Sequence, residues 1–123
     1  MKLILESEQR IRLNADEPAF AIEAAGVELS PFHLLAASLA TCTWSVLLGW
    51  ATHADLETHD LEITVDWEFG GDPYQVSGIV MELIWPGLPP DRHAAARRAA
   101  ALCTVHSTLE HGTEVMTRVA RPR

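Results

Sequence analysis

The fold is decided by residues 29–54, which read LSPFHLLAASLATCTWSVLLGWATHA. Ser30 and Pro31 form a helix-start signal, because serine caps the first turn and proline fits the first helical position without losing a hydrogen bond. The residues that follow carry no formal charge at neutral pH and are apolar on every side. A helix of this kind is buried all round, in a membrane or at the centre of a protein. Cys42, near its middle, is one of only two cysteines in the chain.

The length predicts one domain, which we assign to residues 1–123. A domain of this size is short for wrapping a central helix on every face, so we expect a second subunit to supply part of the cover. The formal net charge is −8 at pH 7. No basic stripe exists to neutralise phosphates, and we therefore expect no nucleic-acid partner.

The N-terminal sequence MKLILESEQR becomes charged before an apolar core develops, which argues against a signal peptide. The helix within 30–54 is long enough to span a bilayer. Its small polar residues, the histidine near each end and the absence of flanking Lys or Arg favour burial in a protein instead. Two cysteines without an export signal are typical of the reducing cytoplasm, where we expect any disulfide to be transient.

Strands are predicted on both sides of the helix. Apolar and polar residues alternate over 61–69, which indicates a half-buried strand. Its apolar face contains Leu61, Ile63, Val65, Trp67 and Phe69. A turn at 70–73 leads to a second long strand at 74–85, so that the two form an antiparallel hairpin. Less regular strands are expected at 2–6, 9–13 and 19–23.

The region after the hairpin contains the second cysteine. Asp91 is expected to cap a helix at 92–102, a stretch with strong helix propensity. Cys103 falls at or just past the end of that helix, and Gly112 breaks the chain before a final strand at 113–120. Elements in this order predict an α+β domain.

Two stretches resemble the OsmC/Ohr family, the osmotically inducible and organic hydroperoxide resistance proteins. They read SPFHLLAASLATC at 30–42 and ALCTVHSTLEHGTEV at 101–115, and the order of elements between them is also similar. The resemblance implies an OsmC-like fold, in which antiparallel sheets wrap around the long central helix of an intertwined homodimer.

The resemblance also implies a reaction, the thiol-dependent reduction of organic hydroperoxides without a cofactor or a metal. Cys42 would be the peroxidatic residue, oxidised to a sulfenic acid, and Cys103 the resolving residue that condenses with it. A cellular dithiol would then reduce the disulfide. Thiol chemistry agrees in part, because a nearby resolving cysteine rescues a sulfenic acid. An apolar setting, however, raises a thiol pKa unless a cation or a helix N-terminus opposes it. The alternative is two unconnected buried cysteines.

One position departs from the family pattern. The peroxidases of this family carry a glutamate after the proline, where it pairs with an arginine from the N-terminal strands that lies over the reactive cysteine. Phe32 occupies that position here, and the adjacent His33 points about 100° away on a helix. Arg10 is the preferred candidate for the substrate-binding cation, and Arg12 shares its strand face. Both arginines could equally lie on a solvated strand edge.

The departure at Phe32 leaves two functions open. The first is the peroxidase, and the second is a protein of the same fold that binds a small apolar molecule in a helix-lined pocket with little or no peroxidase activity. Cys103 and His106 could form at most half a zinc site, so we expect no metal.

Overall fold

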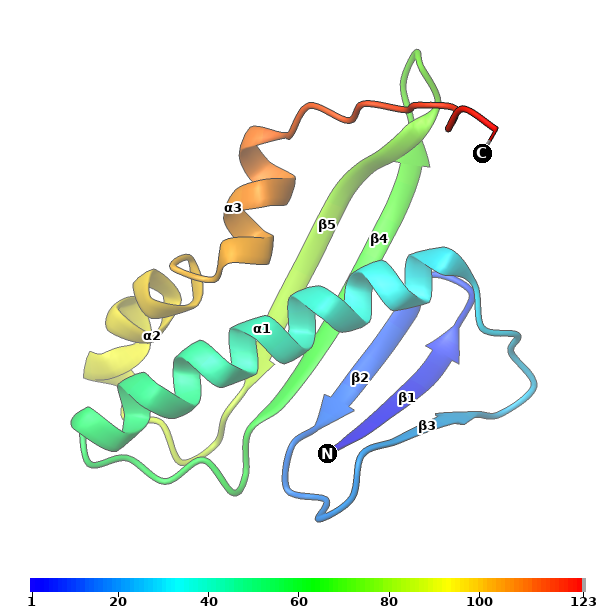
Figure 1. Ribbon diagram of the computed structural model, residues 1–123. Helices are drawn as coiled ribbons and strands as arrows, with labels where there is room; N and C mark the ends of the chain where they lie inside the picture. Colours follow the sequence, from blue (N-terminus) through cyan, green and yellow to red (C-terminus); the bar gives the residue numbers. More distant parts are fainter. Residues whose placement is uncertain (123) are drawn as a thin grey trace.

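The computed structural model describes residues 1–122 and combines one five-stranded sheet with three α-helices (Figure 1). This arrangement confirms the predicted α+β class. The elements are β1 Lys2–Ser7, β2 Arg10–Asn14, β3 Ala21–Ala24, α1 Pro31–His53, β4 Glu62–Gly70, β5 Gln75–Ile84, a 3-10 turn Pro90–Arg92, α2 His93–Ala100 and α3 Thr104–His111.

The strands lie in the order β3-β1-β2-β4-β5. All neighbouring strands are antiparallel except β1 and β3, which are parallel. The register places Ile11 opposite Val65 and Leu13 opposite Ile63. One face of the sheet is therefore continuous and apolar, and the alternation predicted from Leu61 onward is confirmed. The buried residues of this face are Leu3, Leu5, Ile11, Leu13, Leu61, Ile63, Val65 and Trp67.

Helix α1 lies across the apolar face of the sheet, over β2 and β4 (Figure 1). Small residues form much of its inner side. Ala36, Ala40 and Ala51 are almost completely buried there, beside Leu47. Alanine lets the helix approach the strands closely without ordering a long side chain. The helix is long and apolar enough to cross a membrane by length and composition alone, and here its inner side forms part of the hydrophobic core.

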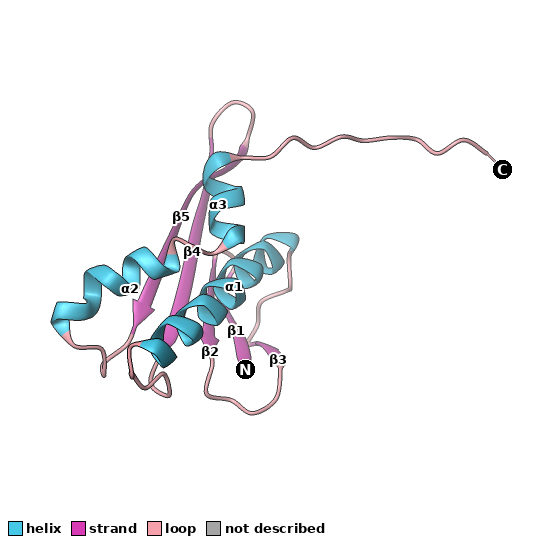
Figure 2. Cartoon of the chain, turned by 60° about the vertical axis from the view of Figure 1, so that its left-hand side comes forward, coloured by secondary structure: helices cyan, strands magenta, loops and turns pink. Residues whose placement is uncertain are grey.

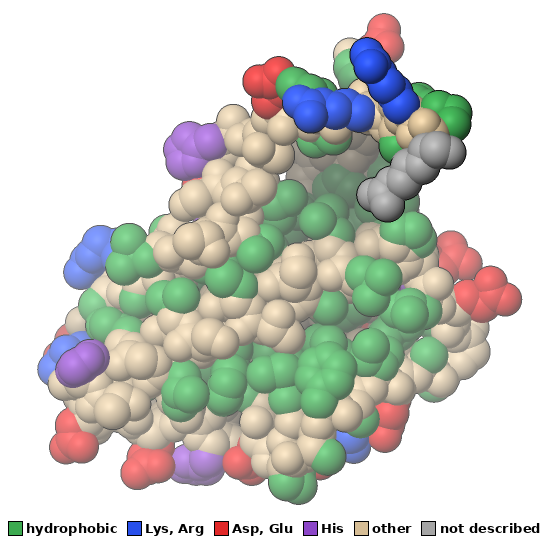
Figure 3. Space-filling view, in the orientation of Figure 1, with side chains coloured by type: hydrophobic (Ala, Val, Ile, Leu, Met, Phe, Trp, Pro, Cys, Tyr) green, Lys and Arg blue, Asp and Glu red, His purple; other side chains and the backbone are tan. Residues whose placement is uncertain are grey.

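The outer side of α1 is not covered within the single chain. Leu34 is 52% exposed and Leu48 is 36% exposed. Within one chain the sheet, α2 and α3 thus cover α1 only in part, and the expectation that a second subunit supplies the rest stays a prediction. Figure 3 shows this outer side, where hydrophobic side chains spread over α1 and charged side chains lie mainly at the rim.

The start of α1 is fixed by Ser30 and His33. The Ser30 side chain accepts a hydrogen bond from the His33 backbone N–H, while His33 Nδ1 accepts one from the Ser30 backbone N–H at 3.0 Å. His33 Nε2 then donates to the carbonyl oxygen of Ser7 at 2.8 Å, and the ring lies edge-on to Trp67. The imidazole is 2% exposed. His33 is thus a buried cap that joins the helix to the β1–β2 turn.

The C-terminal third differs from the sequence prediction in three ways. Asp91 lies inside the 3-10 turn, and α2 begins without a side-chain cap. The helix predicted at 92–102 ends at Ala100. The chain then turns and starts a separate helix, α3, which was not predicted from the sequence. Thr and Val have modest helix propensity, so the segment that follows Cys103 gives a weak signal.

The predicted strand at 113–120 is the third difference. Within residues 1–122 this segment forms no strand. Gly112, with φ of 76°, ends α3 as expected. The chain then extends away from the sheet and helices (Figure 2), and Val119 is 94% exposed. A strand exists only when its backbone is paired, and this segment has no partner strand within the described chain.

The His33 cap leads to a prediction about stability. Replacing His33→Ala removes the bond to Ser7 and opens a small buried space, so we expect the free energy of unfolding to fall by about 2–4 kcal/mol. Ser30→Ala should cost about 1 kcal/mol. The matched control is His53→Ala, an exposed histidine at the other end of α1, which should change stability by less than about 0.5 kcal/mol. Urea unfolding at equal protein concentration measures all three, and equal effects at His33 and His53 would contradict the assignment.

Candidate active site

The two cysteines, which lie far apart in the sequence, come together where α1 meets the start of α3. Cys42 is on the middle turns of α1 and is half-buried, whereas Cys103 is completely buried. Both are free thiols, and Cys42 Sγ lies 3.9 Å from the hydroxyl of Thr104, the residue that follows Cys103. The structure therefore brings the predicted pair together.

Helix α2 precedes Cys103 in the chain and helps to fix its position near Cys42. Buried Ala96, Ala99 and Ala100 pack this helix into the core. After Ala100 the chain turns, and Cys103 becomes the N-cap residue of α3. Its sulfur accepts a hydrogen bond from the His106 backbone N–H at 3.4 Å. The cap fixes Cys103 at the first turn of α3, against α1.

The first turn of α3 also faces the sulfur of Cys42. The Thr104 hydroxyl lies 3.9 Å from Cys42 Sγ, and the backbone N–H groups of Thr104 and Val105 are among the groups that lower the pKa of Cys42. These N–H groups are among the donors that a helix N-terminus leaves without an internal partner. The positive end of the helix dipole also favours negative charge at this point.

The two thiols have opposite pKa shifts. Burial raises the pKa of Cys42, but hydrogen bonds from Cys103, Val105 and Thr104 together lower it below its ordinary value. Burial also raises the pKa of Cys103, and its hydrogen bond to Cys42 raises it further. Cys42 therefore ionises first, and the thiolate is the reactive form of cysteine.

Arg10 and Arg12 lie on the sheet face opposite to α1, because Ile11 and Leu13 occupy the inner positions of β2. Arg10 Nε lies 3.1 Å from Glu6 and 3.6 Å from Asp66. Arg12 is paired with Glu6 at 2.6 Å. Within one chain these arginines are thus not brought to Cys42, and the role of Arg10 in substrate binding stays a prediction.

Phe32 packs edge-on against Phe69 with ring centroids 4.7 Å apart, and Phe69 stacks on Tyr74. The position after the proline therefore contacts the β4–β5 hairpin. A helix N-terminus was expected to be able to activate the thiol, but α3 itself was not predicted from the sequence. The signal was present in part, since Gly112 marks the end of a short helix that begins at Cys103.

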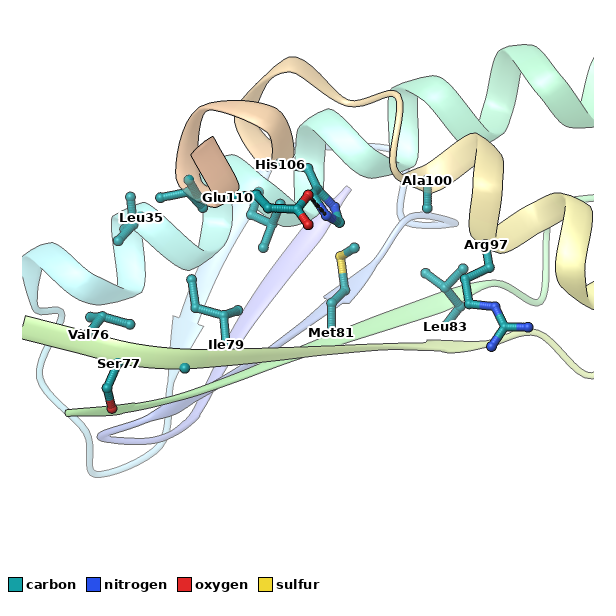
Figure 4. A pocket seen from close by; sticks show the side chains of 13 residues that line it. Leu35, Val76, Ser77, Ile79, Met81, Leu83, Arg97, Ala100, His106 and Glu110 are labelled. Atoms are coloured by element: carbon teal, nitrogen blue, oxygen red, sulfur yellow. Dashed lines mark ion pairs between the residues drawn. The ribbon is translucent and has the colours of Figure 1, made fainter. Parts of the chain in front are cut away.

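A groove of about 490 Å³ lies between α1, β5, α2 and α3 (Figure 4), and neither Cys42 nor Cys103 is among the residues that line it. Leu35 and Leu39 of α1 line it together with Ile79, Met81 and Leu83 of β5. Leu35 and Cys42 are seven residues apart, so they lie on the same side of α1. The part near α2 and α3 is lined by Ala100, Arg97, His106, Leu109 and Glu110. Among the described residues, no group of three or more His, Cys, Asp or Glu side chains is placed to hold a metal ion.

The opposite pKa shifts give a testable consequence. Alkylation of Cys42 by iodoacetamide should reach half its maximal rate at a pH below that of a free cysteine, because its thiolate is stabilised. Thr104→Val removes the hydroxyl near Cys42 Sγ and should move this midpoint to higher pH. Thr108→Val is the control, since the Thr108 hydroxyl bonds to a carbonyl of its own helix. Mass spectrometry identifies the modified cysteine, and equal midpoints in the two variants would contradict this account.

The comparisons with known proteins agree with this architecture. A family model described as OsmC-like protein matches residues 24–118. The fold is similar to that of a solved structure from Psychrobacter arcticus 273-4, provisionally described as an osmotic stress induced and detoxification response protein. The TM-score is 0.60 over 86% of this chain and 84% of that chain, with 18% sequence identity. No protein of curated function matches the sequence. Because the family match covers well over half of the chain, the protein belongs to the OsmC family.

Proposed function

We propose that this OsmC-family protein is a thiol peroxidase that reduces organic hydroperoxides through Cys42 and Cys103. The observation that carries the proposal is the contact of a half-buried thiol of lowered pKa with a fully buried thiol of raised pKa. The partial exposure of Cys42 allows a substrate to reach its sulfur. The burial of Cys103 keeps its thiol away from solvent until the second step of the proposed reaction. The stress and detoxification description of the structural neighbour is consistent with this role.

The first chemical step is attack by the Cys42 thiolate on the outer oxygen of a hydroperoxide. A sulfur–oxygen bond forms while the oxygen–oxygen bond breaks, and its electron pair leaves with the alkoxide. The alkoxide takes a proton and departs as an alcohol, and the Thr104 hydroxyl and the Cys103 thiol are donors at this position. Cys42 is left as a sulfenic acid, with its sulfur oxidised by two electrons.

The second step is attack by the Cys103 sulfur on the sulfur of oxidised Cys42. A disulfide forms, and hydroxide leaves with the proton of the Cys103 thiol as water. An external dithiol then restores both thiols by exchange and is itself oxidised to a disulfide. The apolar residues near Cys42 favour a hydroperoxide with an organic group over hydrogen peroxide.

The homodimer remains part of the proposal and rests on two features of the chain. The first is the outer side of α1, where Ser38, Thr41, Ser45 and Thr52 alternate with exposed Leu34 and Leu48. Each of the four hydroxyls donates to a carbonyl three or four residues earlier in the same helix. A second helix could therefore cover this side without leaving unpaired hydroxyl groups.

The second feature is the extended segment 113–122, which leaves the body of the chain (Figure 2). Val115 and Met116 on it are 82% and 66% exposed. An extended apolar segment of this kind favours pairing with another chain, because an unpaired strand exposes its backbone donors and acceptors. A second copy would cover both this segment and α1.

A second function is favoured by the groove and by Phe32, namely binding of a small apolar molecule without peroxidase turnover. The pocket volume of about 490 Å³ is within the usual range for ligand sites. Thiol titration after one equivalent of hydroperoxide separates the two functions. Loss of both thiols supports the peroxidase, and retention of both supports the binding protein.

The peroxidase is tested directly by consumption of cumene hydroperoxide in the presence of a dithiol. Cys42→Ser should abolish turnover, because the serine hydroxyl is not ionised at neutral pH and is a weak nucleophile. Cys103→Ser should still consume one equivalent in a first turnover and then accumulate the sulfenic acid, which a dimedone adduct reveals by mass spectrometry. Unchanged turnover in Cys42→Ser would overturn the proposal.

The homodimer is tested by the molar mass in solution, measured by light scattering after size-exclusion chromatography. The wild-type chain should be a dimer, and Leu48→Glu should shift it toward monomer, because a charge would be buried at the interface. Val80→Glu is the control, since Val80 is exposed on β5 and not on α1. A monomeric wild-type chain, or equal effects of the two substitutions, would rule out an interface at this side of α1.

A further inference from the structure

The two nitrogens of the His106 ring have different surroundings. Nε2 lies 3.3 Å from the carboxylate of Glu110, one turn further along α3, and both residues line the groove (Figure 4). Nδ1 is buried, and within residues 1–122 no atom forms a hydrogen bond with it. A carboxylate beside Nε2 holds the ring proton on that nitrogen, so Nδ1 is left as an unprotonated acceptor. The buried edge of the ring therefore carries an unused base.

This base belongs to the same helical turn as the Cys103 sulfur. Cys103 is the N-cap residue of α3, and the His106 backbone N–H donates to its sulfur at 3.4 Å. The start of α1 has the same spacing, with Ser30 as the N-cap residue and His33 three positions later. There Nδ1 of the histidine lies 2.8 Å from the side-chain oxygen of the N-cap residue. A histidine at this position of a helix can thus bring Nδ1 to the side chain of the N-cap residue.

The two helix starts differ in what Nδ1 does. In α1 the His33 Nδ1 accepts a hydrogen bond from the backbone N–H of Ser30. In α3 the corresponding N–H of Cys103 donates instead to the carbonyl oxygen of Ala100 at 3.2 Å, so the His106 ring takes no part in the backbone cap. A buried acceptor without a partner lowers stability. The formation of α3 therefore gives no reason for this nitrogen, whereas the chemistry of the neighbouring thiol does.

We propose that His106 is the base that removes the thiol proton of Cys103 when this residue attacks oxidised Cys42, and that Glu110 orients its ring. This inference rests on the second step of the proposed peroxidase reaction. Burial disfavours the charged form of Cys103, so its thiol needs a proton acceptor before it can attack. The proton passes from Sγ to Nδ1, and the electron pair left on sulfur forms the bond to the Cys42 sulfur. The sulfur–oxygen bond of the sulfenic acid breaks, and hydroxide leaves with the proton from Nδ1 as water.

The charges around the ring are compatible with this transfer. Glu110 balances the positive charge that the imidazole gains with the proton. The other charged residue that lines the groove is Arg97 of α2, which projects beside Leu83 (Figure 4). The residues that α1 and β5 contribute to the groove are uncharged. Within residues 1–122 the Glu110 carboxylate forms an ion pair with His106 alone.

The transfer is tested by a reaction that needs no hydroperoxide. The aromatic disulfide dithiobis(nitrobenzoate) forms a mixed disulfide with Cys42 and releases one coloured thiolate, and attack by Cys103 then releases a second. Stopped-flow absorbance separates the two phases, and Cys103→Ser should show only the first. His106→Gln should slow the second phase about a hundredfold at neutral pH, as expected for loss of a general base, and leave the first phase unchanged. Glu110→Gln should slow the second phase about fivefold, because the ion pair is partly exposed.

The pH profile of the second phase distinguishes a base from a residue that only supports α3. In the wild-type chain this phase should accelerate as imidazole loses its proton near neutral pH. In His106→Gln it should accelerate only at alkaline pH, where the thiol ionises directly, so that the two profiles converge there. His106→Ala opens a space at the groove, and added imidazole should restore the second phase in this variant.

The matched control is His111→Gln. His111 lies on the same helix, is exposed, and uses its own Nδ1 to donate to the carbonyl oxygen of Ser107 at 2.9 Å. Its replacement should leave both phases unchanged. Equal second phases in the wild type and His106→Gln, equal pH profiles in the two, or a wild-type chain that releases only one equivalent of thiolate would overturn the inference.

Consumption of cumene hydroperoxide, measured on the same variants, separates this inference from the proposed function. A second phase that depends on His106, in a chain that consumes no hydroperoxide, would refute the peroxidase and leave His106 as the base for the Cys103 thiol. Hydroperoxide turnover together with a second phase that does not depend on His106 would refute the base assignment alone.

Discussion

The proposed thiol chemistry depends on the contact between the Cys42 thiol and the first turn of α3. A thiol on an uncharged helix would ordinarily be held in its neutral, unreactive form by burial. Here the N-terminal donors of α3, which have no partner inside their own helix, meet the sulfur. This contact therefore lowers the pKa of the Cys42 thiol. Because Cys103 caps the same turn, a movement of α3 would alter the activation of Cys42 and the proposed disulfide formation together.

That contact requires α1 to be held at a fixed depth and register on the sheet. The depth is set by Ala36 and Ala40, which allow close approach to the strands. The register along the sheet is set at the start of α1, where His33 joins the Ser30 cap to the carbonyl of Ser7. A histidine that is polar, buried and fully hydrogen-bonded specifies one geometry, whereas an apolar residue would tolerate several. The Cys42 sulfur is thus positioned from a histidine about two and a half helical turns away.

Local patterns in the sequence were sufficient to predict the elements whose causes are themselves local. The alternation from Leu61 and the Ser30-Pro31 cap identified β4 and α1 to within a residue or two. The prediction was wrong where the cause is non-local. The end of α2 at Ala100 depends on how the alanine face packs against α1, and a strand at 113–120 needs a pairing partner that residues 1–122 of one chain do not supply. The side of β2 on which Arg10 lies depends on a strand register that the alternation alone left open.

The peroxidases of the family carry a glutamate at the position of Phe32. Its absence here is consistent with activation of the Cys42 thiol by neutral donors such as backbone N–H groups. A guanidinium buried over Cys42 would need an acid to compensate its loss of hydration, and here Arg10 is paired with Glu6 and Asp66 on the other face of the sheet. Backbone N–H groups already belong to a helix and carry no such cost. Position 32 is then free to pack on Phe69, which keeps the surroundings of α1 apolar. Neutral donors also exert no long-range attraction on an anion.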